Sequence, residues 1–248
     1  MAIATAYPEV DRLKAVYRDK VEVVGNPVRE AVARLGEAPL PPFDEVAPLK
    51  ILVTGGSQGA SILGTVVPAG LGLLEPSLRH RLQVVQQCRP DDIVAVRASY
   101  AALKIPAELM TYITDMPAKL AEAHLIIARA GASTIAELAA AGRPAILVPL
   151  PSATDDHQTA NAREMAKAGG ARMIVQDDFT PETLARQIEA LAKDPEALAN
   201  AAARSLSVGR PNAASDLADL VERIAGGAVL VGPTAIKAPV AMPVGVPA

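Results

Sequence analysis

Short, mostly apolar runs alternate with longer amphipathic stretches from Lys50 to about residue 226. Six runs predict strands, at 51–53, 82–85, 109–112, 125–127, 145–148 and 172–175. The stretches between and after them predict helices at 58–74, 91–103, 116–123, 133–141, 158–167, from 180 onward, 195–206 and 211–225. Such alternation is typical of βαβ units and a parallel sheet. Because the runs are continuously apolar, we expect helices on both faces, which makes an α/β, doubly wound domain at 50–226.

The segments outside this domain have different patterns. Residues 1–24 predict an amphipathic piece and then a short strand at 21–24, which Gly-Asn-Pro at 25–27 ends. Four prolines within 36–48 predict a linker, so residues 1–49 are expected to stand apart from the main domain. Residues 227–248 hold four prolines and a single charge, and we expect a disordered extension there.

Composition narrows the class of protein. Half of the residues are hydrophobic, which excludes a disordered chain, and the formal charge of -3 argues against a general nucleic-acid binder. Cys88 is the single cysteine and cannot form an internal disulfide, which favours a reducing, cytoplasmic compartment. No apolar run reaches the roughly 18–20 residues of a membrane span. The first residues have neither the basic nor the apolar region of a secretory signal.

A glycine-rich loop follows the first predicted strand of the domain. Its sequence, Thr-Gly-Gly-Ser-Gln-Gly-Ala at 54–60, lets the backbone approach a ligand closely. The helix behind it offers free N–H groups and a partial positive charge to a phosphate. The loop matches neither the Walker A pattern nor Gly-x-Gly-x-x-Gly, and a simple tight turn between strand and helix explains it equally well.

A second loop, Arg-Ala-Gly-Ala-Ser-Thr-Ile-Ala-Glu at 129–137, follows the fourth predicted strand. Ser133 or Thr134 is expected to cap the next helix, whose free N–H groups would face an anion. Glu137 lies three residues after Thr134, so the two share a helix face. A carboxylate there could accept two hydrogen bonds from a ribose diol. The alternative is a plain capping box of a hydroxyl residue and Glu.

A third loop, at 149–161, gathers polar side chains after the fifth strand. Its Asp155, Asp156 and His157 are adjacent, and adjacent residues rarely converge on one metal ion. No second histidine stands at ligand spacing either. We therefore expect no metal, and hydrogen bonding to a polyhydroxyl ligand instead. The alternative is an Asp or Thr cap on the next helix.

A fourth loop, at 112–116, could offer backbone groups to the edge of a base. Its alternative is a helix cap at Thr114 or Asp115.

Two other residues with reactive side chains are interpreted as structural. His124 is expected to cap the end of the preceding helix, and Cys88 has no His or Asn nearby in the sequence that would make it a nucleophile.

Four blocks, taken together and in this order, resemble the MurG family. They are Gly-Asn-Pro-Val-Arg at 25–29, Gly-Gly-Ser-Gln-Gly-Ala at 55–60, the block at 129–137, and Asp-His-Gln-Thr-Ala-Asn-Ala at 156–162. The resemblance covers about residues 5–226. This family transfers N-acetylglucosamine from UDP-N-acetylglucosamine to the undecaprenyl-pyrophosphoryl-N-acetylmuramyl-pentapeptide in peptidoglycan synthesis. It implies the GT-B fold of two Rossmann-like domains, of which this chain would have the C-terminal, donor-binding half.

The resemblance also implies roles for individual residues. Ser57 and Gln58 would contact the diphosphate end of the donor, and Arg29 would reach the donor from the interdomain strand. At the helix N-terminus, the diphosphate and the sugar would meet Ala132, Ser133 and Thr134. Ile113 would pair with uracil through its backbone, and Glu137 would bind the ribose hydroxyls. Gln158, with His157, would bind hydroxyls of the sugar, and Arg129 would stabilise the leaving UDP. Transfer would be a direct displacement with inversion, without a metal or cofactor.

The main departure from the family concerns its N-terminal acceptor domain, which has a glycine-rich loop and the candidate general base. Nothing before Gly25 matches these features, so we expect the base to be absent from the chain. The lipid-linked acceptor would then need a missing or separate domain, and the transferase would lie peripherally on the cytoplasmic face of the inner membrane. Thr114, where the family commonly has an acid, is a smaller departure. The alternatives are a UDP-sugar binding module without turnover and a UDP-N-acetylglucosamine 2-epimerase-like protein, which shares the fold.

Overall fold

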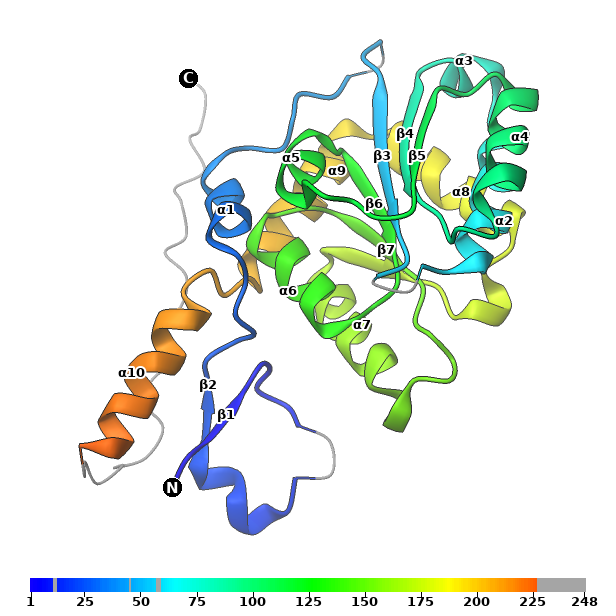
Figure 1. The fold of residues 1–248 in the computed structure, drawn as a ribbon. Helices are drawn as coiled ribbons and strands as arrows, with labels where there is room; N and C mark the ends of the chain where they lie inside the picture. The colour runs from blue at the N-terminus through cyan, green and yellow to red at the C-terminus, as the bar shows by residue number, and fades with distance from the viewer. Residues whose placement is uncertain (11–12, 45, 57–58, 227–248) are drawn as a thin grey trace, which may run out of the picture.

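The computed structural model describes residues 1–10, 13–44, 46–56 and 59–226 (Figure 1). Six parallel strands form its main sheet: β3 (Leu49–Thr54), β4 (Leu82–Gln87), β5 (Ala107–Met110), β6 (Leu125–Ala128), β7 (Ala145–Leu147) and β8 (Ala171–Met173). Their order across the sheet is β5-β4-β3-β6-β7-β8. This is the order of a doubly wound nucleotide-binding sheet, and it confirms the predicted fold class.

Helices cover both faces of this sheet (Figure 1). One face packs against α2 (Ser61–Gly72), α4 (Ile93–Leu103) and α8 (Pro181–Ala192). The other packs against α5 (Met116–Glu122), α6 (Ala132–Ala140) and α7 (His157–Ala168). The remaining helices are α1 (Glu30–Ala33), α3 (Pro76–Arg79), α9 (Pro195–Ser207) and α10 (Ala213–Ala225). Within the described ranges, none of the helices combines the length and apolar character that crossing a bilayer requires.

The two covered faces explain the apolar runs in the central strands. In β3, Ile51 and Val53 belong to one buried cluster and Leu52 to the other. In β6, Ile127 and Ile126 divide in the same way. Alternate side chains of a strand point to opposite faces, and here both faces are covered, so apolar residues are favoured at successive positions.

The strand order reverses between β3 and β6, which lie side by side in the middle of the sheet. Their registers match Thr54 with Ala128, so both strands end at the same level. The chain continues from β3 to α2 on one face and from β6 to α6 on the other. The two loops therefore diverge and leave a crevice at the carboxyl ends of these strands.

The N-terminal segment forms a sheet of its own. β1 (Ile3–Thr5) pairs in parallel with β2 (Val21–Val23), and a 3₁₀ helix (Ala15–Lys20) precedes β2. The predicted strand at 21–24 is confirmed as β2, and the piece before it contains β1 and the 3₁₀ helix. Glu22 of β2 forms an ion pair with Arg223 of α10, so the last described helix lies against this segment (Figure 1). The extension predicted at 227–248 lies outside the described residues.

Three strands begin earlier than the sequence pattern predicts. The strand expected at 51–53 is β3, which begins at Leu49. The strand expected at 109–112 is β5, which ends where Met110 pairs with Gln87, the last residue of β4. Tyr112 beyond it is 70% exposed. The strand expected at 172–175 is β8, which begins at Ala171. The cap predicted for α8 is confirmed, since the Thr180 hydroxyl accepts a hydrogen bond from the N–H of Thr183 at 3.2 Å.

His124 is a correction to the sequence analysis. It does not cap a helix end, because its Nδ1 accepts a hydrogen bond from the N–H of Lys50, the second residue of β3, at 3.0 Å. The ring is buried and lies 5.3 Å from the Phe43 ring in the linker. Burial lowers the pKa of His124, which keeps Nδ1 free to accept the bond.

This arrangement predicts a specific dependence of stability on pH. A histidine in the unfolded chain binds its proton near pH 6.5, whereas folded His124 has a lower pKa. The unfolded state therefore binds more protons below that pH, and stability should fall as the pH drops from about 7 through about 6. The variant His124→Asn, whose Oδ1 can replace Nδ1 as acceptor, should have a flatter profile in urea unfolding at several pH values. The exposed His80→Asn control should behave as wild type. Identical profiles of stability against pH for all three proteins would contradict the role of His124 in this pH dependence.

Candidate functional site

A cavity of about 280 Å³ lies at the carboxyl ends of β3 and β6. Five of the predicted substrate-binding residues line it: Arg29, Ile113, Ser133, Thr134 and Glu137. They come from the segment before α1, the loop after β5, and α6. The structure therefore brings together residues that are up to 108 positions apart in the sequence.

The start of α6 faces this cavity. The helix begins at Ala132, and Gly131 is its N-cap, without a side-chain hydrogen bond to the first turn. The prediction that Ser133 or Thr134 caps the helix is wrong, because an N-cap must precede the helical residues and both lie within the first turn. The first turn thus has N–H groups that no side chain caps, and these give the cavity a partial positive charge.

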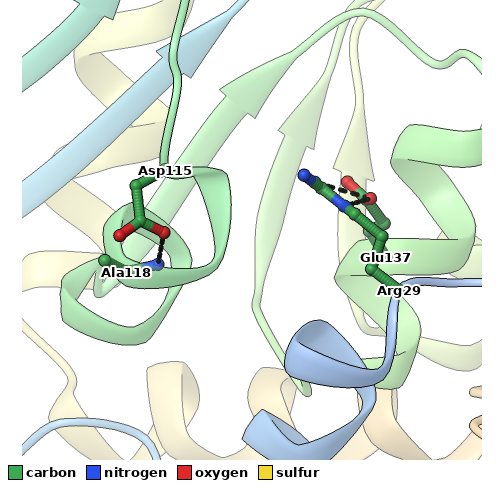
Figure 2. Close-up of polar contacts among 4 residues, drawn as sticks. All are labelled: Arg29, Asp115, Ala118 and Glu137. Carbon is green, nitrogen blue, oxygen red and sulfur yellow. Dashed lines mark hydrogen bonds and ion pairs between the residues drawn. The ribbon is translucent and has the colours of Figure 1, made fainter.

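Arg29 and Glu137, which both line the cavity, form an ion pair (Figure 2). Nε and Nη2 of the arginine donate to the same oxygen, Oε1, at 3.1 and 2.8 Å. The second oxygen, Oε2, accepts no hydrogen bond from a described residue. Because Glu137 is engaged with Arg29, the capping-box alternative for this carboxylate does not hold.

The loop after β5 forms the opposite wall. Asp115 caps α5, since its carboxylate accepts a hydrogen bond from the N–H of Ala118 at 3.1 Å (Figure 2). The helix cap weighed for this loop is therefore confirmed at Asp115. The Ile113 side chain is buried, while neither its N–H nor its C=O has a hydrogen-bond partner among the described residues. The same residue can thus supply an apolar wall and open backbone groups.

The third loop lies beside the cavity rather than in it. Gln158 Oε1 accepts hydrogen bonds from the N–H groups of Ala130 and Leu150, both at 3.1 Å, so it joins the loops that follow β6 and β7. The exposed His157 ring bonds to the carbonyl of Thr154 at 2.7 Å through Nδ1. Among the described residues, no three His, Cys, Asp or Glu side chains gather as a metal site requires. Ser57 and Gln58 lie outside the described residues.

Two polar residues of the cavity wall were given no role of their own in the sequence analysis. Thr54 ends β3 and Gln87 ends β4, and their side chains are hydrogen-bonded to each other at 2.9 Å. Both are buried. The available signal was the pair of glutamines at 86–87, because two polar side chains at the end of a buried strand need hydrogen-bond partners.

Comparison with known proteins decides the family. Residues 50–224 match the sequence model of the Glycosyltransferase family 28 C-terminal domain. The chain belongs to this family. Apart from Leu49, the first residue of β3, the matched range contains the doubly wound sheet from β3 to β8.

Relatives of this glycosyltransferase domain are longer than the chain. A UDP-N-acetylglucosamine--N-acetylmuramyl-(pentapeptide) pyrophosphoryl-undecaprenol N-acetylglucosamine transferase of Erythrobacter litoralis is 62% identical over 91% of this chain and 56% of its own length. The crystal structure of MurG from Acinetobacter baumannii has a TM-score of 0.71 and 34% identity, over 90% of this chain and 60% of that one. The UDP-GlcNAc 2-epimerase of Neisseria meningitidis shares only the fold, with a TM-score of 0.54 and 16% identity over 83% and 56%. The chain thus spans a little over half the length of these proteins.

Arg129 begins the second motif of this domain, yet its side chain does not line the cavity. It is buried, and Nη1 donates to the carbonyls of Val148 and Pro149 at 3.1 and 3.0 Å. Nη2 donates to Gln176 Oε1 at 2.6 Å. The guanidinium thus joins the ends of β6 and β7 to the segment after β8. With its hydrogen bonds directed to these groups, Arg129 holds the loops together. Its guanidinium does not point into the cavity, where it would have to lie to stabilise a leaving group.

We expect the variant Arg129→Leu to lose stability, because two buried carbonyls and the half-buried side chain of Gln176 lose a charged donor. The free energy of unfolding in urea should fall by about 2–3 kcal/mol. Arg163→Leu, at an exposed position of α7, should stay within about 0.5 kcal/mol of wild type. Equal stability of Arg129→Leu and wild type would show that these hydrogen bonds are not structural.

Proposed function

We propose that this chain binds UDP-N-acetylglucosamine and acts as the donor-binding half of a transferase. The transferase would move N-acetylglucosamine to the lipid-linked N-acetylmuramyl-pentapeptide in peptidoglycan synthesis. The names of the Erythrobacter and Acinetobacter relatives support this reaction. The single observation on which the proposal depends is the cavity at the switch point, where Arg29, the start of α6 and Glu137 meet.

The donor's diphosphate is assigned to the side of the cavity formed by α6. Its uncapped N–H groups and the helix dipole favour an anion at Ser133 and Thr134. Arg29 lies within reach of the same space, and its guanidinium can bind phosphate oxygens in a forked geometry. Ser57, Gln58 and Ala132 are proposed to complete this subsite.

The nucleoside is assigned to the side formed by Glu137 and the loop after β5. Oε2 of Glu137 can accept hydrogen bonds from the ribose hydroxyls while Oε1 keeps its contact with Arg29. The backbone groups of Ile113 can pair with the polar edge of uracil, and Met116 and Leu120 supply an apolar wall.

The sugar is assigned to the side that faces the third loop. Gln158 Oε1 is occupied by two backbone N–H groups, which fixes the orientation of its amide. Its Nε2 then faces away from those groups and can donate to a sugar hydroxyl. His157 is proposed as a further contact to the sugar.

The proposed reaction is a direct displacement with inversion. The acceptor hydroxyl attacks the anomeric carbon, its proton passes to a general base, and the bond to the UDP oxygen breaks. Negative charge grows on the leaving diphosphate, and the positive end of α6 together with Arg29 can stabilise it without a metal. We therefore assign leaving-group stabilisation to Arg29 in place of Arg129.

The acceptor site and the general base are assigned to the portion of the relatives that this chain does not match. That portion could be supplied by a separate polypeptide. A lipid-linked acceptor would bring the assembled transferase to the cytoplasmic face of the membrane. The proposal therefore separates donor binding, which this chain can be tested for directly, from transfer.

Isothermal titration calorimetry on the 248-residue chain tests the donor assignment. UDP and UDP-N-acetylglucosamine should both bind, with the UDP part supplying most of the affinity. Glu137→Ala should weaken UDP binding by about 1–3 kcal/mol, because the ribose loses a charged hydrogen-bond acceptor. Glu122→Ala is the matched control, since it removes an acid paired with Lys50 near the amino end of β3, at the opposite end of the strands from the cavity. Absence of UDP binding to folded wild-type protein would refute the proposed function.

A variant of Arg29 provides a second test, which distinguishes binding of the diphosphate from binding of the nucleoside. Arg29→Gln should weaken UDP binding about tenfold, because a charged donor to the diphosphate is lost. Uridine, which has no phosphate, should bind within about twofold of wild type. The two ligands can be compared by competition against a fluorescent uridine nucleotide. An equal loss for both ligands would mean that Arg29 acts only by orienting Glu137.

A further inference from the structure

The side chains of Thr54 and Gln87 form a closed hydrogen-bonded ring with the backbone N–H and C=O of one residue of the cavity wall, Gly56. The Thr54 hydroxyl donates to Gln87 Oε1 at 2.9 Å. Gln87 Nε2 donates to the carbonyl of Gly56 at 2.8 Å, and the N–H of Gly56 donates back to the Thr54 hydroxyl at 3.3 Å. Both polar backbone groups of Gly56 are therefore held by side chains.

The same carboxamide also reaches the other wall of the cavity. Gln87 Nε2 makes a longer contact with the carbonyl of Thr111, at 3.4 Å. Thr111 is two residues before Ile113, whose open backbone groups face the nucleoside side. One buried side chain thus connects the loop after β3 with the loop after β5.

The geometry of Gly56 needs such support. Its φ is +79°, a left-handed conformation that only glycine adopts without strain. A Cβ at this position would meet no atom within 4 Å, so packing does not hold the peptide in place. Its orientation depends on hydrogen bonds, including its carbonyl's bond from the N–H of Gly59 at 3.1 Å.

The chemistry of the ring requires an amide at position 87. The side chain must accept from Thr54 and donate to Gly56 at the same time, which a carboxylate or a hydrocarbon cannot do. Its neighbour Gln86 provides a contrast, because it points to the other face of the sheet and accepts a hydrogen bond from the Tyr100 hydroxyl.

We propose that Gln87, together with Thr54, is a positioning residue for the nucleotide donor. Its side chain fixes the position of Gly56 relative to the loop that contains Ile113. The two sides of the cavity proposed to bind the diphosphate and the nucleoside are then already in place before the ligand binds. This inference rests on the proposed function, because the ligand it positions is the UDP part of the donor.

Four variants of the 248-residue chain test the ring. Gln87→Leu and Thr54→Val should each weaken UDP binding about tenfold in calorimetry, because each opens the ring without removing a group proposed to touch the ligand. Thr54→Ser keeps the hydroxyl and should bind within about twofold of wild type. The double variant Gln87→Leu/Thr54→Val should bind UDP about as tightly as each single variant, because both substitutions break the same network.

The matched control is Gln86→Leu, an adjacent glutamine in the same strand. It leaves the buried Tyr100 hydroxyl without its partner, so its unfolding midpoint should fall while UDP affinity stays within about twofold of wild type. Amide hydrogen exchange at Gly56 gives a readout without ligand, and protection should be lost in Thr54→Val and kept in Thr54→Ser and Gln86→Leu.

The outcomes separate the two proposals. A folded Gln87→Leu or Thr54→Val that binds UDP as tightly as wild type would overturn the positioning role alone. Affinity losses that merely follow the fall in stability, with Gln86→Leu as weak as the others, would also overturn it. Failure of the wild-type chain to bind UDP would overturn the proposed function and this inference with it.

Discussion

The reversal of strand order between β3 and β6 is the constraint on which the rest of the site depends. Because these strands end at the same level and their helices pack on opposite faces, the loops behind them diverge. The start of α6, the loop after β3 and the loop after β5 then border one space. With an unbroken strand order, the following helices would lie on one face, and these loops would not border a common crevice.

The fold could be predicted because its determinants are local. Each buried strand appears as a short apolar run, and Thr180 followed by Pro181 indicates the start of α8 through the chemistry of the first helical turn. β1 escaped prediction because Ile3–Thr5 is too short for a period to be visible. Its pairing with β2 depends on a contact between segments about 18 residues apart. The early start of β5 likewise follows from pairing with β4, which no local pattern contains.

The site was only partly predictable, because a motif shows which residues occur and not where their side chains point. Ser133, Thr134 and Glu137 lie where the motif suggested, since a helix fixes its own faces. Arg129 stands at the head of the same motif, but backbone carbonyls after β7 attract its guanidinium away from the cavity. Gln87 is the opposite case, because the sequence placed it in a buried strand with no role at the site. Its proposed role depends on its hydrogen bond to Gly56, 31 residues earlier in the chain.

The cavity also extends beyond the residues that define the family. The match covers 50–224, yet the cation of the cavity is Arg29. The segment that presents it turns at Gly25, where φ is +90° and where a Cβ would lie 2.5 Å from the Cβ of Arg210. Only glycine allows this close approach, so the path toward Arg29 is set by the segment just before α10. Residues from both ends of the described chain therefore fix the position of a charge that the central sheet alone could not supply.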